Sequence, residues 1–168
     1  MSKTDQCLKD AFAGESQANR KYLAFSKKAE QEGYKRAARM FRAAAAAETV
    51  HAHNHLRELN GVRSTRENLM EAITGESYEF QKMYPAMIED ARMEGKDGAL
   101  RSFLYANEVE KVHAALYRKV LDSLDQDKGR DRVPDFHVCQ VCGHTVEGDA
   151  PDECPVCRSR KQAFQRVE

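Results

Sequence analysis

The sequence has no excess of charge of either sign, no long apolar run and no apolar segment at its start. Lys and Arg together number 27, as do Asp and Glu, so no net field attracts nucleic acid or an anionic membrane. No apolar run reaches the roughly 18 residues that a membrane-spanning helix needs, and residues 1–6 lack the core of a signal peptide. We therefore expect a cytoplasmic protein with no nucleic-acid partner and no membrane partner.

Cysteine is scarce outside one short region. Cys7 stands alone, and the other four cysteines form two C-x-x-C pairs, Cys139 with Cys142 and Cys154 with Cys157. In a chain without an export signal this pattern is typical of a metal site and not of disulfides. Two such pairs hold one tetrahedral ion through four thiolates, as zinc or iron. A tail of about 30 residues needs such an ion because it is too short to bury a sufficient core.

The longer first part of the chain contains one motif twice. Glu48–His51 and Glu110–His113 each place a carboxylate three residues before a histidine, and on a helix this spacing projects both groups from one face. Each copy has a further glutamate 33 or 34 residues upstream, Glu15 and Glu76. Two copies of Glu…Glu-x-x-His on helix pairs form the ligand set of a carboxylate-bridged two-metal site in a four-helix bundle.

The apolar pattern predicts four long helices. Ser64–Glu67 has the form of a capping box at the start of the third helix, and Pro85 predicts a kink near Tyr84 within it. The bounds that we expect are about 4–32, 34–59, 65–94 and 97–125. The fold class is then an all-α, ferritin-like four-helix bundle over residues 1–126, a linker over 127–135 and a small metal-bound domain of strands and loops over 136–168.

Glutamates interrupt the predicted apolar seam at one level, where Glu79 adds a fifth carboxylate to the four of the repeated motifs. Burying a carboxylate without a partner costs several kcal/mol, so we expect two cations at this level. Carboxylates with two imidazoles suit iron or manganese, and the cysteine tail favours iron. Tyr22 and Tyr84 follow Glu15 and Glu76 by seven and eight residues. Each hydroxyl can donate a hydrogen bond to a ligand, with core packing as the alternative.

Along essentially its whole length the sequence resembles the rubrerythrin family. The segments that carry the resemblance are Phe12–Gln17, Glu48–His51, Gly75–Glu79, Met83–Pro85, Glu110–His113 and the four paired cysteines. The resemblance implies a non-haem di-iron peroxidase that reduces hydrogen peroxide to water. It also implies a rubredoxin-like domain whose four-thiolate iron (or zinc, in recombinant protein) relays electrons from a partner reductase or rubredoxin.

The resemblance further implies a role for each site residue. The expected ligands of the two irons are Glu15, Glu48, Glu76, Glu110 and His113, with Glu79 and His51 as alternative ligands that exchange with redox state, and Cys139, Cys142, Cys154 and Cys157 hold the third iron. Tyr22 and Tyr84 match the family's hydrogen-bonding tyrosines. Our own hypothesis for Glu79 is that it moves off iron in the reduced state and either shuttles protons or opens a coordination position. Arg158 is a departure, because rubredoxin-like tails usually have glycine there. A positive φ at this residue would strain it.

A distance argument predicts a homodimer. His113 precedes the expected end of its helix by twelve residues, or ~18 Å, and the cysteine tail lies beyond that end. Electron transfer within one chain is then expected to be slow, and a head-to-tail homodimer would shorten the path. The link over Gly61–Thr65 offers an exchange of helix pairs between subunits as a second form. The family resemblance implies a dimer as well.

Three other functions compete with this interpretation. A ferritin-like ferroxidase that handles iron gives the cysteine tail no role. A non-catalytic zinc ribbon on a dimerising helical platform leaves the seam glutamates unexplained. A manganese catalase-like site needs no external electrons and therefore no electron carrier.

Overall fold

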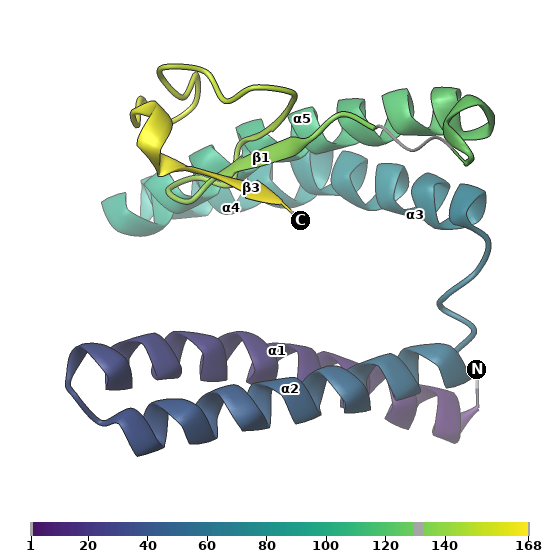
Figure 1. Ribbon diagram of the computed structural model, residues 1–168, viewed down its shortest axis with the longest axis vertical. Helices are drawn as coiled ribbons and strands as arrows, with labels where there is room; N and C mark the ends of the chain where they lie inside the picture. The colour runs from purple at the N-terminus through teal and green to yellow at the C-terminus, as the bar shows by residue number, and fades with distance from the viewer. Residues whose placement is uncertain (1, 130–132, 168) are drawn as a thin grey trace. The chain divides into compact units, whose positions relative to one another are not determined.

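The structure is a computed structural model that describes residues 2–129 and 133–167 (Figure 1). The chain divides into two compact units, Met1–Arg63 and Ser64–Glu168. None of the helices within the described ranges is both long and apolar enough to cross a bilayer.

The first unit is an antiparallel pair of helices, α1 (Lys3–Gln31) and α2 (Lys35–Glu58). Ser2 begins α1 with a capping box that includes Asp5, and Gly33 adopts a φ of +84° in the turn between the helices. Alanines recur every seven residues along α2 and are at most 6% exposed, and these are Ala38, Ala45 and Ala52. Such small side chains allow α1 and α2 to approach closely, and both helices begin and end within two residues of the predicted bounds.

A buried asparagine fixes the register between α1 and α2. The amide nitrogen of Asn19 donates to the carbonyl of Ala45 at 2.7 Å and to the hydroxyl of Thr49 at 2.9 Å. Asn19 lies one turn after Glu15, and Thr49 directly follows Glu48. The bonds therefore hold the two glutamates of this unit at one level.

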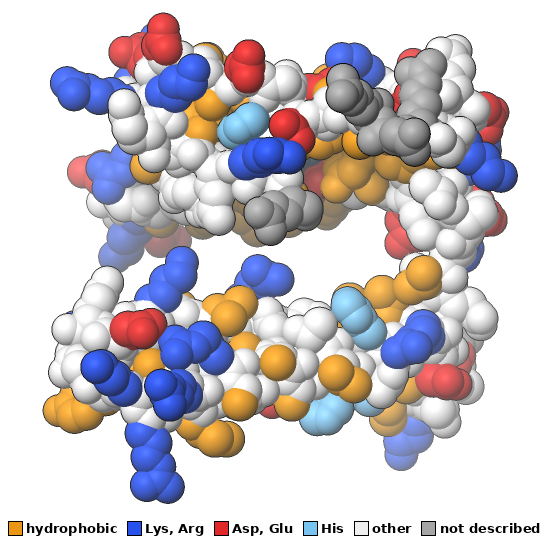
Figure 2. Space-filling view, viewed as in Figure 1, with side chains coloured by type: hydrophobic (Ala, Val, Ile, Leu, Met, Phe, Trp, Pro, Cys, Tyr) orange, Lys and Arg blue, Asp and Glu red, His pale blue; other side chains and the backbone are white. Residues whose placement is uncertain are grey.

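The first unit also leaves large apolar side chains exposed. Figure 2 shows hydrophobic side chains on the visible face of the α1–α2 pair, between Lys and Arg side chains. The large exposed apolar residues of this unit are Leu23, Phe25, Tyr34, Met40, Val50 and Val62.

The second unit begins with α3 (Thr65–Tyr78), a π-helical turn η1 (Glu79–Met83), α4 (Tyr84–Met93) and α5 (Asp97–Asp127). The predicted capping box is confirmed, since Ser64 accepts from the Glu67 amide and Glu67 accepts from the Ser64 amide. The third helix was predicted to be continuous with a kink near Tyr84. Instead a wider turn comes just before it. Pro85 has no N–H to donate to the preceding turn, and the Tyr84 amide bonds to the carbonyl of Glu79.

The tail domain, residues 133–167, contains β1 (Phe136–Cys139), β2 (Thr145–Glu147), the short helix η2 (Lys161–Ala163) and β3 (Phe164–Val167). The strands form an antiparallel sheet in the order β2-β1-β3. Val138 lies opposite Thr145, and Cys139 opposite Phe164. The expected linker at 127–135 is shorter at its start because α5 extends through Asp127. Residues 130–132 of that linker lie outside the described residues.

The expected fold class is confirmed. Four long helical segments, the third interrupted by the π-helical turn, precede a small domain of short strands and loops.

Candidate metal centres

The first candidate site lies within the α1–α2 pair and is called here the α1–α2 triad. The ligand atoms of Glu15, Glu48 and His51 lie within 4.8 Å of one another. His51 Nδ1 is 2.9 Å from Oε2 of Glu48, across one turn of α2. Glu15 and Glu48 are half-buried, whereas the His51 side chain is 53% exposed. The repeated spacing thus brings three of the predicted ligands together.

The second candidate site, the α3–α5 triad, repeats this arrangement in the second unit. Glu76 of α3 and Glu110 and His113 of α5 place their ligand atoms within 4.8 Å of one another. His113 Nδ1 lies 2.8 Å from Oε2 of Glu110 and 3.9 Å from Oε2 of Glu76. All three side chains are half-buried. Each triad therefore offers two carboxylates and one imidazole, which is half of the predicted donor set.

The electrostatics of the α3–α5 triad show crowded negative charge. Burial, a hydrogen bond with Glu110 and repulsion from its charge raise the pKa of Glu76 to about 7, against the opposing effect of His113. Burial also raises the pKa of Glu110 above its usual value. Glu76 is therefore partly protonated near neutral pH in the metal-free protein. A divalent cation would replace this proton and stabilise both carboxylates.

Glu79 and Tyr84 lie close enough to this triad for its charges to shift their pKa values. Burial raises the pKa of Glu79, and the charge of Glu76 raises it further. Burial likewise raises the pKa of Tyr84, followed by the charges of Glu110, Glu79 and Glu76. In a regular helix Tyr84 would lie about 80° around the axis from Glu76, since eight residues advance about 800°. The wider turn at 79–83 advances each residue by less, which brings Tyr84 toward the face of Glu76.

Tyr22 lies in an aromatic cluster of the first unit. Its ring centroid is 6.3 Å from that of Phe25 and 6.1 Å from that of Phe41. These ring contacts support the packing alternative for Tyr22, and its hydroxyl makes no hydrogen bond among the described residues. Asn107, one turn before Glu110, has a buried Oδ1 with no hydrogen-bond partner in the described part of the chain.

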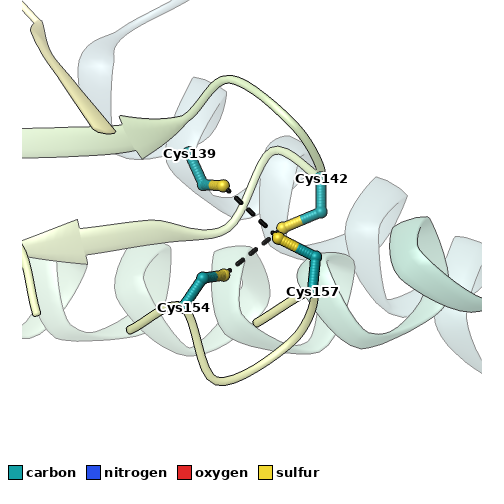
Figure 3. A group of neighbouring side chains, drawn as sticks. All are labelled: Cys139, Cys142, Cys154 and Cys157. Atoms are coloured by element: carbon teal, nitrogen blue, oxygen red, sulfur yellow. Dashed lines mark hydrogen bonds between the residues drawn. The ribbon is translucent and has the colours of Figure 1, made fainter. Parts of the chain in front are cut away.

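The four paired cysteines converge in the tail domain (Figure 3). Cys139 and Cys157 place their Sγ atoms 3.6 Å apart, as do Cys142 and Cys154. A disulfide would need about 2.05 Å, whereas sulfurs bound at about 2.3 Å around a tetrahedral ion lie roughly 3.8 Å apart. The spacing therefore fits a four-thiolate metal ion.

The thiols differ in acidity within this cluster. Burial raises the pKa of Cys142 and of Cys154. Burial alone would raise the pKa of Cys157 too, but the hydroxyl and amide of Ser159 outweigh it and lower that pKa to about 6. The next residue, Arg158, has a φ of +63°, the conformation in which a residue other than glycine is strained. Its guanidinium lies 3.0 Å from the carboxylate of Glu153.

The tail domain packs along α5 at the level of the α3–α5 triad. Thr145 Oγ1 lies 2.9 Å from Nε2 of His113, and the ammonium of Lys119 lies 2.6 Å from the carboxylate of Glu147. The distance argument made from the sequence is therefore wrong. It placed the cysteines beyond the end of the helix, but the chain turns back after α5 and brings the first cysteine pair beside His113. Sequence reasoning missed Thr145, because nothing in the residue type or its spacing marks it.

A cavity of about 430 Å³ lies beside this contact. Its polar lining comes from Glu76, His113, Tyr117 and Thr145, and its apolar lining from α3, α5 and β1. Glu76 and His113 of the α3–α5 triad are thus accessible from this cavity.

The donor chemistry fits both kinds of metal site. The two triads supply four carboxylates and two imidazoles, a set suited to iron, and the four thiolates suit iron or zinc. Fold and sites together define the class of the protein, a ferritin-like helical di-iron protein with a four-cysteine domain. The comparisons with known proteins refine this class.

The chain belongs to the rubrerythrin family. The model of the rubrerythrin family matches residues 6–121, and the model of the rubrerythrin rubredoxin-like domain matches residues 137–165. Rubrerythrin-2 of Clostridium acetobutylicum is 35% identical over 96% of this chain and 95% of its own length. Nigerythrin of Nitratidesulfovibrio vulgaris is 36% identical over 94% of this chain and 83% of its own length.

Solved structures agree with this assignment. The mixed-valence state of nigerythrin aligns with a TM-score of 0.58 at 35% identity, covering 99% of this chain and 88% of that one. The fully reduced, all-ferrous state gives the same TM-score at 34% identity. Membership of the family implies a di-iron site, and the rubredoxin-like domain fits a role in electron transfer.

Proposed function

We propose that this protein is a peroxidase that reduces hydrogen peroxide to water with electrons relayed through its rubredoxin-like domain. The observation that carries the proposal is the contact between Thr145 of that domain and His113 of the α3–α5 triad, 2.9 Å long. The contact brings the four-cysteine domain, whose proposed iron would carry one electron at a time, beside half of the proposed di-iron donor set. Ferroxidases and catalases have no use for such a carrier, whereas reduction of H2O2 to two H2O consumes two protons and two electrons, which a carrier can deliver.

The proposed ligands follow the two triads. Glu15, Glu48, Glu76, Glu110 and His113 would hold the two irons, with Glu79 and His51 as alternative ligands of one of them. The exposed side chain of His51 supports this exchange because it has room to move, and Glu79 lies outside both triads. When bound, the iron pair would supply the two electrons and Lewis acidity toward the departing oxygen.

Residues of the chain would deliver protons and donate hydrogen bonds to the peroxide. Glu79 has a raised pKa beside Glu76, so it can carry a proton at a pH where an ordinary glutamate has lost one. The Tyr84 hydroxyl is protonated near neutral pH, as tyrosines ordinarily are, and its raised pKa extends this to higher pH. It would donate a hydrogen bond toward the same space. We assign Tyr22 a hydrogen-bonding role only when the α1–α2 triad is metal-loaded.

We further propose a homodimer in which helix pairs are exchanged. The exposed apolar side chains of the first unit (Figure 2) and its half set of ligands support this, since a second helix pair would cover the former and complete the latter. The distance reason for a head-to-tail arrangement no longer applies. A monomeric mass by analytical ultracentrifugation, measured on iron-loaded active protein, would refute the dimer. The expected compartment is the cytoplasm, where thiolate sites stay reduced.

The peroxidase is tested on protein purified without oxygen and loaded with iron. We expect about three irons per chain from the two kinds of site, and a red colour from ferric thiolate. Hydrogen peroxide should then oxidise NADH in a one-to-one ratio when a rubredoxin-reducing reductase is present. Release of oxygen without NADH would indicate a catalase. Storage of ferric iron from added Fe(II) without peroxide turnover would indicate a ferroxidase.

A further inference from the structure

Thr145 reaches His113 because the first cysteine pair is folded around it. Gly143, just after Cys142, adopts a φ of +86°. A Cβ on this glycine would lie 3.7 Å from Val109 of α5, so the backbone of the cysteine turn packs directly on the helix. Thr145 then begins β2 and pairs with Val138 of β1. Both the fold of the cysteine turn and the sheet therefore fix where its hydroxyl points.

The hydrogen bonds around Thr145 favour one direction for its contact with His113. The Thr145 hydroxyl has one proton and can donate it to the carbonyl of Gly143 at 3.1 Å. Its oxygen then accepts from Nε2 of His113 at 2.9 Å, which places the imidazole proton on Nε2. In this arrangement Nδ1 has a lone pair, which at 2.8 Å from Oε2 of Glu110 needs a proton or a cation between the two atoms. A lone pair directed into a cluster of carboxylates is the arrangement that a metal-binding histidine needs.

We propose that Thr145 is a positioning residue for His113, through which the rubredoxin-like domain fixes the tautomer and ring orientation of a ligand in its own chain. This inference rests on the proposed role of His113 as an iron ligand. It adds that the tail domain contributes to the helical metal site as well as carrying electrons to it. A hydrogen-bond partner of this kind typically changes metal affinity 10–100-fold.

Docking of the tail domain on α5 and contact with His113 involve different residues, so that each can be changed without the other. Lys119 and Glu147 make a second polar contact between α5 and β2, at 2.6 Å, six residues along α5 from His113. Removing that ion pair loosens the docking of the domain without touching the imidazole. A Thr145 variant and a Lys119 variant therefore distinguish positioning of His113 from simple docking.

The test compares Thr145→Val, which keeps the shape but lacks the hydroxyl, with Thr145→Ser, which restores it, and with Lys119→Met. In the zinc-loaded full chain, ¹⁵N spectra of the histidines should show His113 protonated at Nε2 in the wild type and in Thr145→Ser. In Thr145→Val this proton should exchange faster with water or the tautomers should mix. In the ferrous protein, iron should leave the helical site for a chelator about 10-fold faster or more in Thr145→Val alone.

The red absorption of the four-thiolate iron reports on the fold of the tail domain in each variant. If Thr145→Val keeps the wild-type tautomer and iron release, the proposal is overturned. If Lys119→Met matches Thr145→Val, the effect belongs to docking and the proposal is equally overturned. These readouts do not depend on turnover, so absence of peroxidase activity in the wild type would instead count against the proposed function.

Discussion

Glu110 and His113 hold a carboxylate oxygen and an imidazole nitrogen 2.8 Å apart across one turn of α5. Glu48 and His51 repeat the relation at 2.9 Å in α2. Because a single helical turn sets both distances, no loop has to become ordered before a metal binds. Each helix pair thus presents its donors largely preformed.

Removing the charge of Glu110 should release the iron held by the two triads, called here the helical site, but not the iron held by the cysteines. In Glu110→Gln, the shape is kept but the nearest carboxylate to His113 is lost, so most iron of the helical site should be absent. Elemental analysis gives total iron, and the red absorption gives the share held by the cysteines, which should not change. Glu108→Gln is the matched control, because Glu108 is exposed and bonds only to Lys111 among the described residues. Equal iron contents in the two variants would contradict a ligand role for Glu110.

The metal-free protein should become more stable as the pH falls from 8 toward 6. The pKa of Glu76 is about 7 in the folded state, against about 4.5 when unfolded, so the folded state holds an extra proton in this window. Stability is therefore lost as the pH rises through 7. The melting temperature measured with a chelator present should show this slope, and Glu76→Gln should flatten it. A melting temperature that rises with pH over this range would refute the assignment.

Replacing Glu79 should slow turnover without emptying the site. Glu79 lies outside both triads yet carries a raised pKa beside Glu76, so Glu79→Ala removes a proton carrier more than a ligand. We expect peroxide turnover to fall by about 10²-fold while most iron stays bound. Glu89→Ala, on exposed surface of α4, is the control. Unchanged turnover in Glu79→Ala would exclude this residue from the reaction.

Breaking the cysteine cluster should uncouple electron supply from the helical site. Cys142→Ser should abolish the red colour and NADH-dependent peroxide reduction, because one of four thiolates is lost. Reduction of peroxide by protein whose helical iron was reduced chemically beforehand should survive for a single turnover. Cys7→Ser, at an exposed position of α1, should behave as wild type. Persistent NADH-dependent activity in Cys142→Ser would rule out relay through the cysteines.

Arg158 should be a source of strain in the tail domain. Its φ of +63° costs an ordinary residue about 1–2 kcal/mol, and the exposed pair with Glu153 returns at most about 1 kcal/mol. Arg158→Gly should therefore stabilise the domain, by up to about 1 kcal/mol, in denaturant titrations followed at the red absorption. Glu153→Gln removes the ion pair alone and should be slightly destabilising. Asn60→Gly, at a φ of +52°, should have little effect since asparagine tolerates this region.

The sequence was sufficient for the features that depend on local spacing. The three-residue separation of Glu48 from His51 and of Glu110 from His113 predicted both triads, because a helix converts that spacing into proximity. The C-x-x-C pairs predicted the thiol cluster because two such pairs are typical of a four-thiolate metal site. The capping box at Ser64 follows from side chains three residues apart.

Features that depend on long-range packing were not predictable in this way. The contact between His113 and Thr145 joins residues 32 apart, and it requires the chain to reverse direction after α5. A polar linker does not encode that reversal. The aromatic cluster at Tyr22 depends on which rings of α1 and α2 meet. The π-helical turn was expected only as a kink at Pro85, because the rearranged hydrogen bonds precede the proline.

The π-helical turn at 79–83 makes the number of residues in this stretch a constraint of its own. Deleting one residue there would let the backbone close into a regular helix in which Tyr84 follows Glu76 by seven residues, about 20° short of two full turns. The later side chains of α4 would keep their faces, with Tyr84 near Glu76 and with Ile88 and Ala91, now 7% and 5% exposed, still in the core. An added residue would instead rotate all of them by about 100°. A single deletion should thus be better tolerated in this stretch than an insertion.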